Sequence, residues 1–301
     1  TGIFKPGIQG TLVLSTGRQN TSMAWGIFYQ VVNIGGFMGP LVAVHMRQLS
    51  WDNVFYACAA IISLNFLFLL AYKEPGKEER LERNRKIKSG EIQQEALWRD
   101  ALNELKKPVV IYYMLVFAGF WFLFNALFDV LPIHIAEWVD TSVIVTSLFG
   151  PEGTSNGFFQ FWLGLDNTGT KVMPEGMLNL NAGMIMTTCF LVAALTAKYR
   201  ITTAMLGGCL LSILAFVFIG ATNAAWMIVL AIAMFSFGEM MISPKKNEFM
   251  GNIAPGGKKA MYLGFVMLPQ GIGWTLEGYF GPKLYEMYAS KEVFSLQLLG
   301  E

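Results

Sequence analysis

A series of apolar blocks, each about 20 residues long, constrains this chain more than any other feature, because a helix of that length crosses the hydrocarbon core of a bilayer. Backbone groups find no water there, so such blocks must be helices, and they lack the period-two alternation of a closed barrel. The chain of 301 residues is 54% hydrophobic and 14% charged, which is too apolar for an ordinary soluble domain. The sequence therefore predicts an all-α polytopic membrane protein with spans near 22–45, 53–72, 109–131, 177–197, 202–221, 224–244 and 259–281.

Two shorter apolar stretches lie at the ends, at Ile3 to Leu14 and Val293 to Gly300. The first is interpreted as the remainder of a helix that began upstream, and the second as the start of another. Because the chain begins with Thr1 rather than Met, we expect an internal fragment that holds helices 4 to 11 of a twelve-helix protein.

The one long polar segment, residues 73–107, fixes the predicted orientation. If the loops alternate, most of the 22 Lys and Arg residues fall on its side of the membrane, and the positive-inside rule makes that side cytoplasmic. The basic residues on this side are Arg18, the ten of the segment, Lys198, Arg200, Lys245, Lys246, Lys258 and Lys259. The opposite side holds Arg47, Lys171, Lys283 and Lys291. We expect the plasma membrane, as a bacterial inner membrane.

The linker and the longest loop on the opposite side are predicted in outline only. In the second part of the linker, helical spacing fits either an amphipathic surface helix or a solvated connector, and both stay open; its apolar positions are Ile92, Ala96, Leu97, Ala101, Leu102 and Leu105. The loop Pro132 to Glu175 is predicted to be external, with its GFFQFWLG piece at the interface.

A long cytoplasmic connector between two helical bundles is the layout of two-halved secondary carriers. The predicted divisions are 1–72 for the end of the N-terminal bundle, 73–107 for the linker, and 108–301 for the C-terminal bundle. The net charge of +1 gives no reason to expect nucleic acid. Cys58, Cys189 and Cys209 lack metal-ligand spacing, so neither metal nor cofactor is expected.

Charged residues within spans are costly, so each needs a reason. Lys5 precedes Pro6 in a Gly-rich helix, and Glu239 lies between Gly238 and Pro244. Gly and Pro beside an ionisable group are typical of a helix that bends next to a hydrated cavity. We expect both groups to face one cavity, where each exchanges a proton or pairs with the other. A structural ion pair is the alternative for Glu239, and for Lys5 both interpretations carry equal weight.

Other polar residues give weaker signals. Asp129 and Glu277 are expected near external helix ends as interfacial anchors, and His45 and His134 as capping or solvated groups. The amides within helices bind either a polar solute or a neighbouring helix; they are Gln30, Asn33 and Asn125.

Several motifs resemble the proton-dependent oligopeptide transporter branch (POT, or PTR) of the major facilitator superfamily. TGIFKPGIQGT resembles its G-x-G-x-x-K-P signature, and FYQVVNIGG its fifth-helix F-Y-x-x-x-N-x-G, with Phe28, Tyr29, Asn33 and Gly35 as the matching residues. GEMMISP resembles the tenth-helix G-E-x-x-x-S-P, and IAPGGKKAMYLG the following loop. The resemblance covers nearly the whole chain.

The resemblance implies that Lys5 and Glu239 contact the charged ends of a substrate and take part in proton coupling, and that Asn33 lines the same cavity. Two departures stand out. The E-x-x-E-R-F motif of the family's first helix has no counterpart in this sequence, and Asn125 stands where relatives often carry an acid. Asp129, one turn later, is the candidate for that coupling role.

These observations favour a secondary active transporter that carries small peptides or a similar polar solute together with protons. A carrier of a sugar, organic anion or drug, as symporter or antiporter, remains the alternative. An enzyme is not expected, because GxSxG and HExxH are absent and only two histidines occur. A receptor or scaffold would leave Lys5 and Glu239 without a role.

Overall fold

The structure, a computed structural model, describes residues 4–17, 19–72, 75–90 and 97–293. These residues form helices joined by short loops, and their only β-pairing is an isolated bridge between Leu165 and Val172. The helices are α1 (Phe4–Ser15), α2 (Thr21–Leu49), α3 (Trp51–Ala71), α4 (Lys77–Lys88), α5 (Leu97–Leu105), α6 (Pro108–Trp138), α7 (Ser142–Phe149), α8 (Gly157–Leu163), α9 (Pro174–Thr196), α10 (Ile201–Ala221), α11 (Ala225–Ile253), α12 (Lys259–Phe265) and α13 (Leu268–Tyr288).

Within the described residues, 5 helices are long and apolar enough to cross a membrane, namely α3, α6, α9, α10 and α11. Helices α2 and α13 reach membrane-spanning length as well, with 29 and 21 residues. The predicted all-α polytopic fold is therefore confirmed.

One predicted span is wrong in its bounds. The block 259–281 divides into α12 and α13, which are separated by Val266 and Met267. Pro269 lies in the first turn of α13, where proline is tolerated because the backbone N–H that it lacks would have no partner within the helix. This helix starts at Leu268 and continues to Tyr288.

Two helices run further than predicted, through an internal proline. Helix α6 contains Pro132 and ends at Trp138, and α11 contains Pro244 and ends at Ile253. A proline removes one backbone hydrogen bond without ending a membrane helix, because neighbouring helices compensate for the freed carbonyl. As a consequence, the first residues of the expected external loop belong to α6, and the expected cytoplasmic Lys245 and Lys246 belong to α11.

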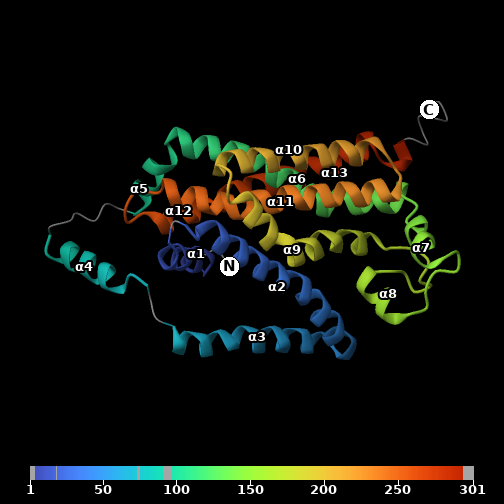
Figure 1. Cartoon of the computed structure of the whole chain (residues 1–301), viewed down its shortest axis with the longest axis horizontal. Coiled ribbons are helices and arrows are strands. Elements are labelled where there is room, and N and C mark those ends of the chain that lie inside the picture. The colour runs from blue at the N-terminus through green and yellow to red at the C-terminus, as the bar shows by residue number, and fades with distance from the viewer. Residues whose placement is uncertain (1–3, 18, 73–74, 91–96, 294–301) are drawn as a thin grey trace.

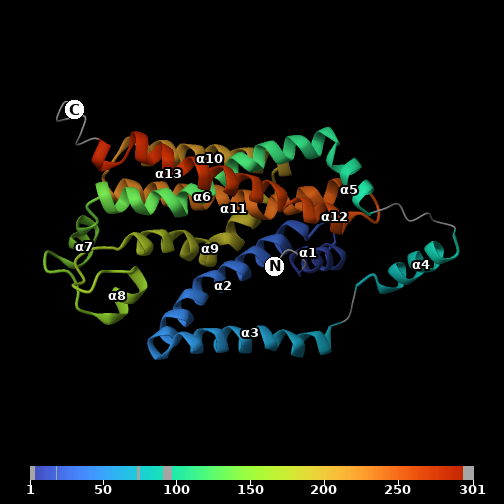
Figure 2. The same cartoon turned by 180° about the vertical axis from the view of Figure 1, so that it is seen from behind.

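The long helices form a layered bundle. Helices α6, α10, α11 and α13 run side by side, α9 lies next to them, and α2 crosses obliquely beneath α9 (Figure 1). Helices α1, α5 and α12 lie toward one end of the bundle, with α4 projecting beyond them, whereas α7 and α8 lie at the other end (Figure 2). We call the end with α1, α5 and α12 the linker end, and the end with α7 and α8 the loop end.

Small residues set the closest helix contacts. Gly208 of α10 faces the backbone of Gly238 in α11, and a Cβ atom built on Gly208 would lie 2.6 Å from the Gly238 carbonyl oxygen. Gly273 of α13 approaches the backbone of α6 in the same way, with the Ala118 carbonyl oxygen 2.5 Å from a built Cβ atom. Close approach of small residues is the usual way in which membrane helices associate, since burial of apolar surface gains little in lipid.

Among the helices of membrane-spanning length, α3 differs from the others because none of its residues is buried. Its Trp, Phe, Tyr, Ile and Leu side chains, from Trp51 to Leu70, are all exposed. Among the described helices it packs against α2 (Figure 1). Its surface suits a hydrocarbon environment and no aqueous one.

The structure describes parts of the linker 73–107 and of the predicted external loop. Helix α5 covers the second half of the linker and turns Ala101 and Leu105 toward the core, while Trp98 and Leu102 are exposed. Ile92 and Ala96 lie outside the described residues. GFFQFWLG forms α8, whose Phe158 is 63% exposed and whose Trp162 stacks on Phe37 of α2 with ring centroids 5.6 Å apart.

Candidate functional site

The acid singled out by the sequence lies in the interior of the bundle. Glu239 is 1% exposed and sits in the middle of α11. Helix α10 approaches α11 at the preceding residue, Gly238. An ionised carboxylate in this position requires hydrogen-bond donors from the protein, because burial deprives it of water.

Glu239 receives donors from two other helices. The Tyr29 hydroxyl of α2 donates to Glu239 Oε1, and the Asn181 amide of α9 donates to Oε2 at 2.9 Å. Asn181 also donates to Ser236 Oγ at 3.0 Å, one turn before the acid on α11. Three helices therefore meet at one carboxyl group, and α2 belongs to the part of the chain that precedes the linker.

The other amides predicted on α2 fall near this contact but serve different partners. Gln30 donates to the Met186 carbonyl of α9 at 2.8 Å, which ties α2 to α9 beside Tyr29. Asn33 donates to the Tyr29 carbonyl at 2.9 Å, within its own helix. The predicted use of such amides in helix–helix bonding thus applies to Gln30.

The structure leaves the predicted partnership of Lys5 with Glu239 untested. Lys5 belongs to α1, whose backbone packs against α12 near the linker end, but its side chain lies outside the described part of the chain, as does that of His45. The pairing of Lys5 with Glu239 stays a prediction.

Two buried lysines were assigned to a loop, which is wrong. Lys246 lies seven residues beyond Glu239 on the same face of α11, and its ammonium group is 4.0 Å from the ring centroid of Trp121 in α6. Lys245 pairs with Glu248 at 3.1 Å in a site where both side chains are nearly inaccessible. Sequence reasoning missed them because it ended the helix at Pro244. Two adjacent lysines directly after an apolar run were the sequence feature that could have indicated a longer helix with buried charges.

A second polar cluster joins α6 to α13. Asn125 donates to Asp129 Oδ2 at 2.9 Å and to Glu277 Oε2. Glu277 is 0% exposed and lies in the middle of α13, so the expectation of an anchor at an external helix end is wrong for this residue. The continuation of α13 to Tyr288, beyond the predicted end at residue 281, places it there. Asp129 is exposed, but α6 continues to Trp138, so this residue does not lie at a helix end either.

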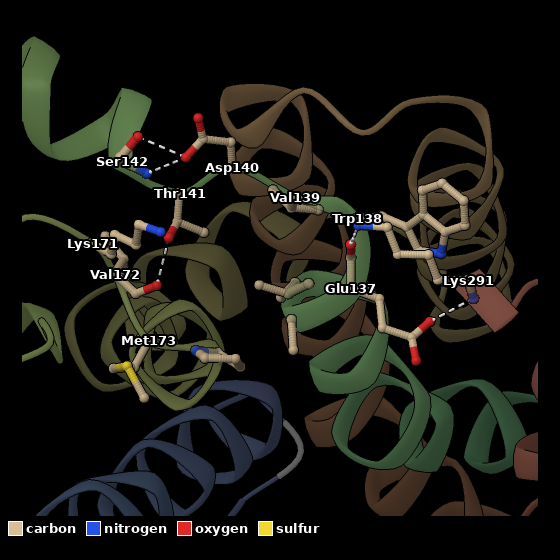
Figure 3. Close-up of a pocket in the computed structure, with 13 residues that line it drawn as sticks. Glu137, Trp138, Val139, Asp140, Thr141, Ser142, Lys171, Val172, Met173 and Lys291 are labelled. Carbon is tan, nitrogen blue, oxygen red and sulfur yellow. Dashed lines mark hydrogen bonds between the residues drawn. The ribbon is translucent and has the colours of Figure 1, made fainter. Parts of the chain in front are cut away.

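Two cavities lie toward the loop end of the molecule. The first, about 500 Å³, is lined by the end of α6, the start of α7, residues 171–174 and Lys291 (Figure 3). The second, about 460 Å³, is apolar and lies among α7, α8, α9 and α11, with Phe37 of α2 on its wall. Neither is lined by a residue that the sequence predicted for solute or proton binding.

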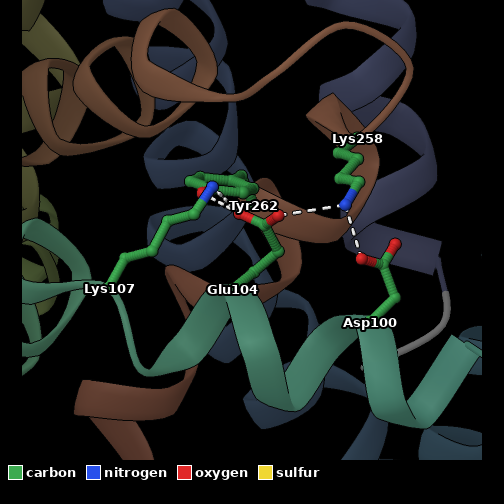
Figure 4. A network of polar contacts seen from close by, with 5 residues as sticks. All are labelled: Asp100, Glu104, Lys107, Lys258 and Tyr262. Carbon is green, nitrogen blue, oxygen red and sulfur yellow. Dashed lines mark hydrogen bonds and ion pairs between the residues drawn. The ribbon is translucent and has the colours of Figure 1, made fainter.

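At the linker end, a polar network joins α5 to α12. Lys258 donates to Asp100 at 2.5 Å and to Glu104 at 3.0 Å, and Tyr262 donates to Glu104 at 2.5 Å (Figure 4). Lys107 pairs with the same carboxyl group at 2.5 Å. These contacts, that of Lys107 first, lower the pKa of Glu104 to about 2.

The sequence profile of the Major Facilitator Superfamily matches residues 1–276 of the chain. The chain belongs to the major facilitator superfamily. Among curated proteins, none matches it. As a superfamily member it is a secondary membrane transporter that carries a small solute and sits in a lipid bilayer.

Membership of the superfamily indicates where in the bundle a solute site is to be sought, and Glu239 can be compared with that place. In two-halved carriers the solute and coupling-ion sites lie near the midplane, between the halves. Glu239 lies where α2 meets α9 and α11, and it contributes a buried carboxyl group to that contact. A carboxyl group can bind a proton or pair with a cationic group.

Proposed function

We propose that this transporter moves small peptides or a similar polar solute together with protons, by alternating access. The proposal assigns residues 1–72 to one half, 73–107 to a cytoplasmic linker and 108–301 to the other half, in a plasma membrane. One observation carries it: a fully buried carboxyl group, Glu239, bonds across the contact between the halves to Tyr29. The POT resemblance of the residues around Lys5, Tyr29 and Glu239 supports the peptide as substrate.

The proposed coupling follows from what Glu239 requires in each state. While the halves touch, Tyr29 and Asn181 supply two donors to the carboxyl group. When rocking draws α2 away, the group loses the Tyr29 donor and meets water or substrate. A proton on Glu239 lowers the cost of that loss, because a neutral acid tolerates burial better than a carboxylate does.

In this proposal the predicted residues take distinct roles. Glu239 binds the proton, Lys5 and Glu239 hold the charged ends of the solute, and Asn33 lines the path beside them. Gln30 fixes α2 on α9 through Met186. Asn125 and Asp129 belong to the separate cluster on α6 and α13.

The test is uptake of radiolabelled dialanine into liposomes that contain the Glu239→Gln variant. A pH gradient of one unit is worth about 1.4 kcal/mol per proton, enough for about tenfold accumulation at one proton per solute. We expect wild type to accumulate the dipeptide under the gradient. The variant should equilibrate it without accumulation, while exchange of labelled for unlabelled dipeptide continues.

Glu175→Gln provides the matched control, because Glu175 is an exposed acid in the first turn of α9. It should accumulate dialanine as wild type does. Full gradient-driven accumulation by Glu239→Gln would refute the coupling role. A wild-type protein that ignores dialanine but concentrates a sugar or an organic anion would replace the peptide with that solute.

A further inference from the structure

Glu277 is a second buried acid, which the proposed coupling through Glu239 does not use. It lies on α13, is inaccessible to solvent, and packs against α6. Its Oε2 atom accepts a hydrogen bond from Asn125, but its Oε1 atom is buried and has no hydrogen-bond partner among the described residues. A buried carboxylate with one oxygen unsatisfied is costly, so the arrangement favours the state that carries a hydrogen on that oxygen.

Asn125 connects this acid to the surface of the protein. One amide nitrogen donates to both Glu277 and Asp129, which uses both of its hydrogens. Asp129 lies one turn along α6 from Asn125 and is exposed. The buried acid and the exposed acid are thus linked through a single amide.

Glycine makes the space for the Glu277 carboxyl group. Gly281 lies one turn further along α13, and a Cβ atom there would clash with Oε1 and lie 2.9 Å from Cδ of Glu277. The carboxyl group therefore folds back over a residue that has no side chain. Glycine at position 281 thus leaves room for the Glu277 carboxyl group between α13 and α6.

The charges around the cluster leave Glu277 without a cationic partner. Within the described residues no Lys or Arg forms an ion pair with it. On its own helix Lys283 lies over the Tyr279 ring, 3.8 Å from the centroid, and Glu286 is exposed. The groups that face Glu277 from α6 are Asn125 and the acid Asp129, and α12 contributes no charged contact to it in the described structure.

We propose that Glu277 and Asp129, joined by Asn125, form a second proton-binding site in this transporter, separate from Glu239. One proton adds to a carboxylate oxygen as a new O–H bond, and the second carboxyl group and the Asn125 amide stabilise the pair; no other bond changes. Within the part of the chain that the structure describes, no group of three or more His, Cys, Asp or Glu side chains could hold a metal ion.

The transport role of this site rests on the proposed proton coupling, but proton binding itself is measurable without any solute. The experiment records infrared difference spectra of the full chain in lipid nanodiscs as the pH is stepped. We expect wild type to show a carboxylic-acid C=O band that disappears as the pH rises. The Glu277→Gln variant should lack that component, and Asp129→Asn should change the pH at which it disappears.

Three comparisons make the result decisive. Glu286→Gln, an exposed acid on the same helix, should retain the band, and Glu239→Gln should retain it too, which separates this site from the proposed coupling acid. Size-exclusion profiles report whether each variant is folded. Identical spectra for wild type, Glu277→Gln and Asp129→Asn would overturn the proposal, and so would loss of the band on adding sodium at constant pH.

Discussion

Gly238 shows how much one residue decides in this bundle. It precedes Glu239 on α11 and faces Gly208 and Ser212 of α10. A Cβ atom at this position would lie 2.6 Å from the Gly208 carbonyl oxygen and 2.6 Å from Ser212 Oγ, closer than real Cβ contacts allow. The absence of a side chain therefore sets the spacing of two helices and the depth of the neighbouring acid.

We expect Gly238→Ala to destabilise the protein by about 1–3 kcal/mol, because the added methyl group forces two backbones apart. The change should appear as a lower temperature of thermal unfolding in detergent. Gly220→Ala on α10 is the matched control, since a Cβ atom there meets nothing within 4 Å. It should be neutral or stabilising, because alanine favours helix more than glycine does. Equal unfolding temperatures for the two variants would contradict the close contact.

The sequence predicts the environment of a side chain where that environment depends on the residues next to it in the chain. Glu239 stands out as an acid in an apolar run between Gly238 and Pro244, and it is indeed buried. Its partners Tyr29 and Asn181 come from helices 210 and 58 residues away, and no local pattern specifies such contacts. Asn181 was not predicted at all.

At the scale of elements, α5 is a short helix held by charge as well as by apolar contact. Asp100 and Glu104 lie one turn apart and share Lys258 from the start of α12 (Figure 4). Tyr262 adds a donor to Glu104 from α12 itself. The network ties the linker to the segment between two membrane helices.

This attachment should depend on pH through Glu104. Its pKa falls from an ordinary value of 4.5 to about 2 in the folded protein. A carboxyl group with a lowered pKa stabilises the folded state at higher pH, and the contribution is lost as the pH falls from its ordinary pKa through the folded value. We therefore expect α5 to stay docked above about pH 4.5 and to detach progressively toward pH 2.

Pepsin provides the measurement, since it works in this range and cleaves beside the large apolar residues of α5. Cleavage within Leu97–Leu105 should rise in wild type as the pH is lowered. In Glu104→Gln, cleavage should be high at every pH in the range, whereas Glu82→Gln on α4 should follow wild type. The same cleavage profile for Glu104→Gln and wild type would show that the carboxyl group does not hold the helix.

Element boundaries were predictable where composition changes sharply and not where proline intervenes. The spans of α3, α9 and α10 agree with the apolar blocks to within a few residues. Pro132 and Pro244 were taken as ends, yet both are internal, whereas Pro269 does begin a helix. A proline's effect depends on whether neighbouring helices compensate for the lost hydrogen bond, which local sequence does not reveal.

In the molecule as a whole, α2 connects the part of the chain before the linker to the part after it. It bonds to α9 through Gln30 and to α11 through Tyr29, and about two turns further along Phe37 stacks on Trp162 of α8. Transport by rocking of the proposed halves requires some of these contacts to open. The Phe37–Trp162 contact lies toward the loop end and is open to chemical cross-linking.

We expect a short bifunctional thiol reagent to block solute flux when it joins Phe37→Cys to Trp162→Cys, in a background without native cysteines. Reduction of a cleavable reagent should restore flux. The matched control pair is Phe149→Cys with Phe159→Cys, whose native rings are 5.1 Å apart and lie in α7 and α8, both after the linker. Cross-linking that pair should leave flux intact. If solute flux continues after Phe37→Cys and Trp162→Cys are cross-linked, transport does not require α2 and α8 to separate.

The Tyr29–Glu239 bond has a consequence for reagents that act from outside. If protonation of Glu239 shifts α2 as proposed, thermodynamic linkage makes an antibody fragment that clamps α2 against α8 alter the acidity of that carboxyl group without touching it. Its own affinity must then vary with pH by the same factor. A binding isotherm recorded at two acidities would therefore report on the proton inside the bundle.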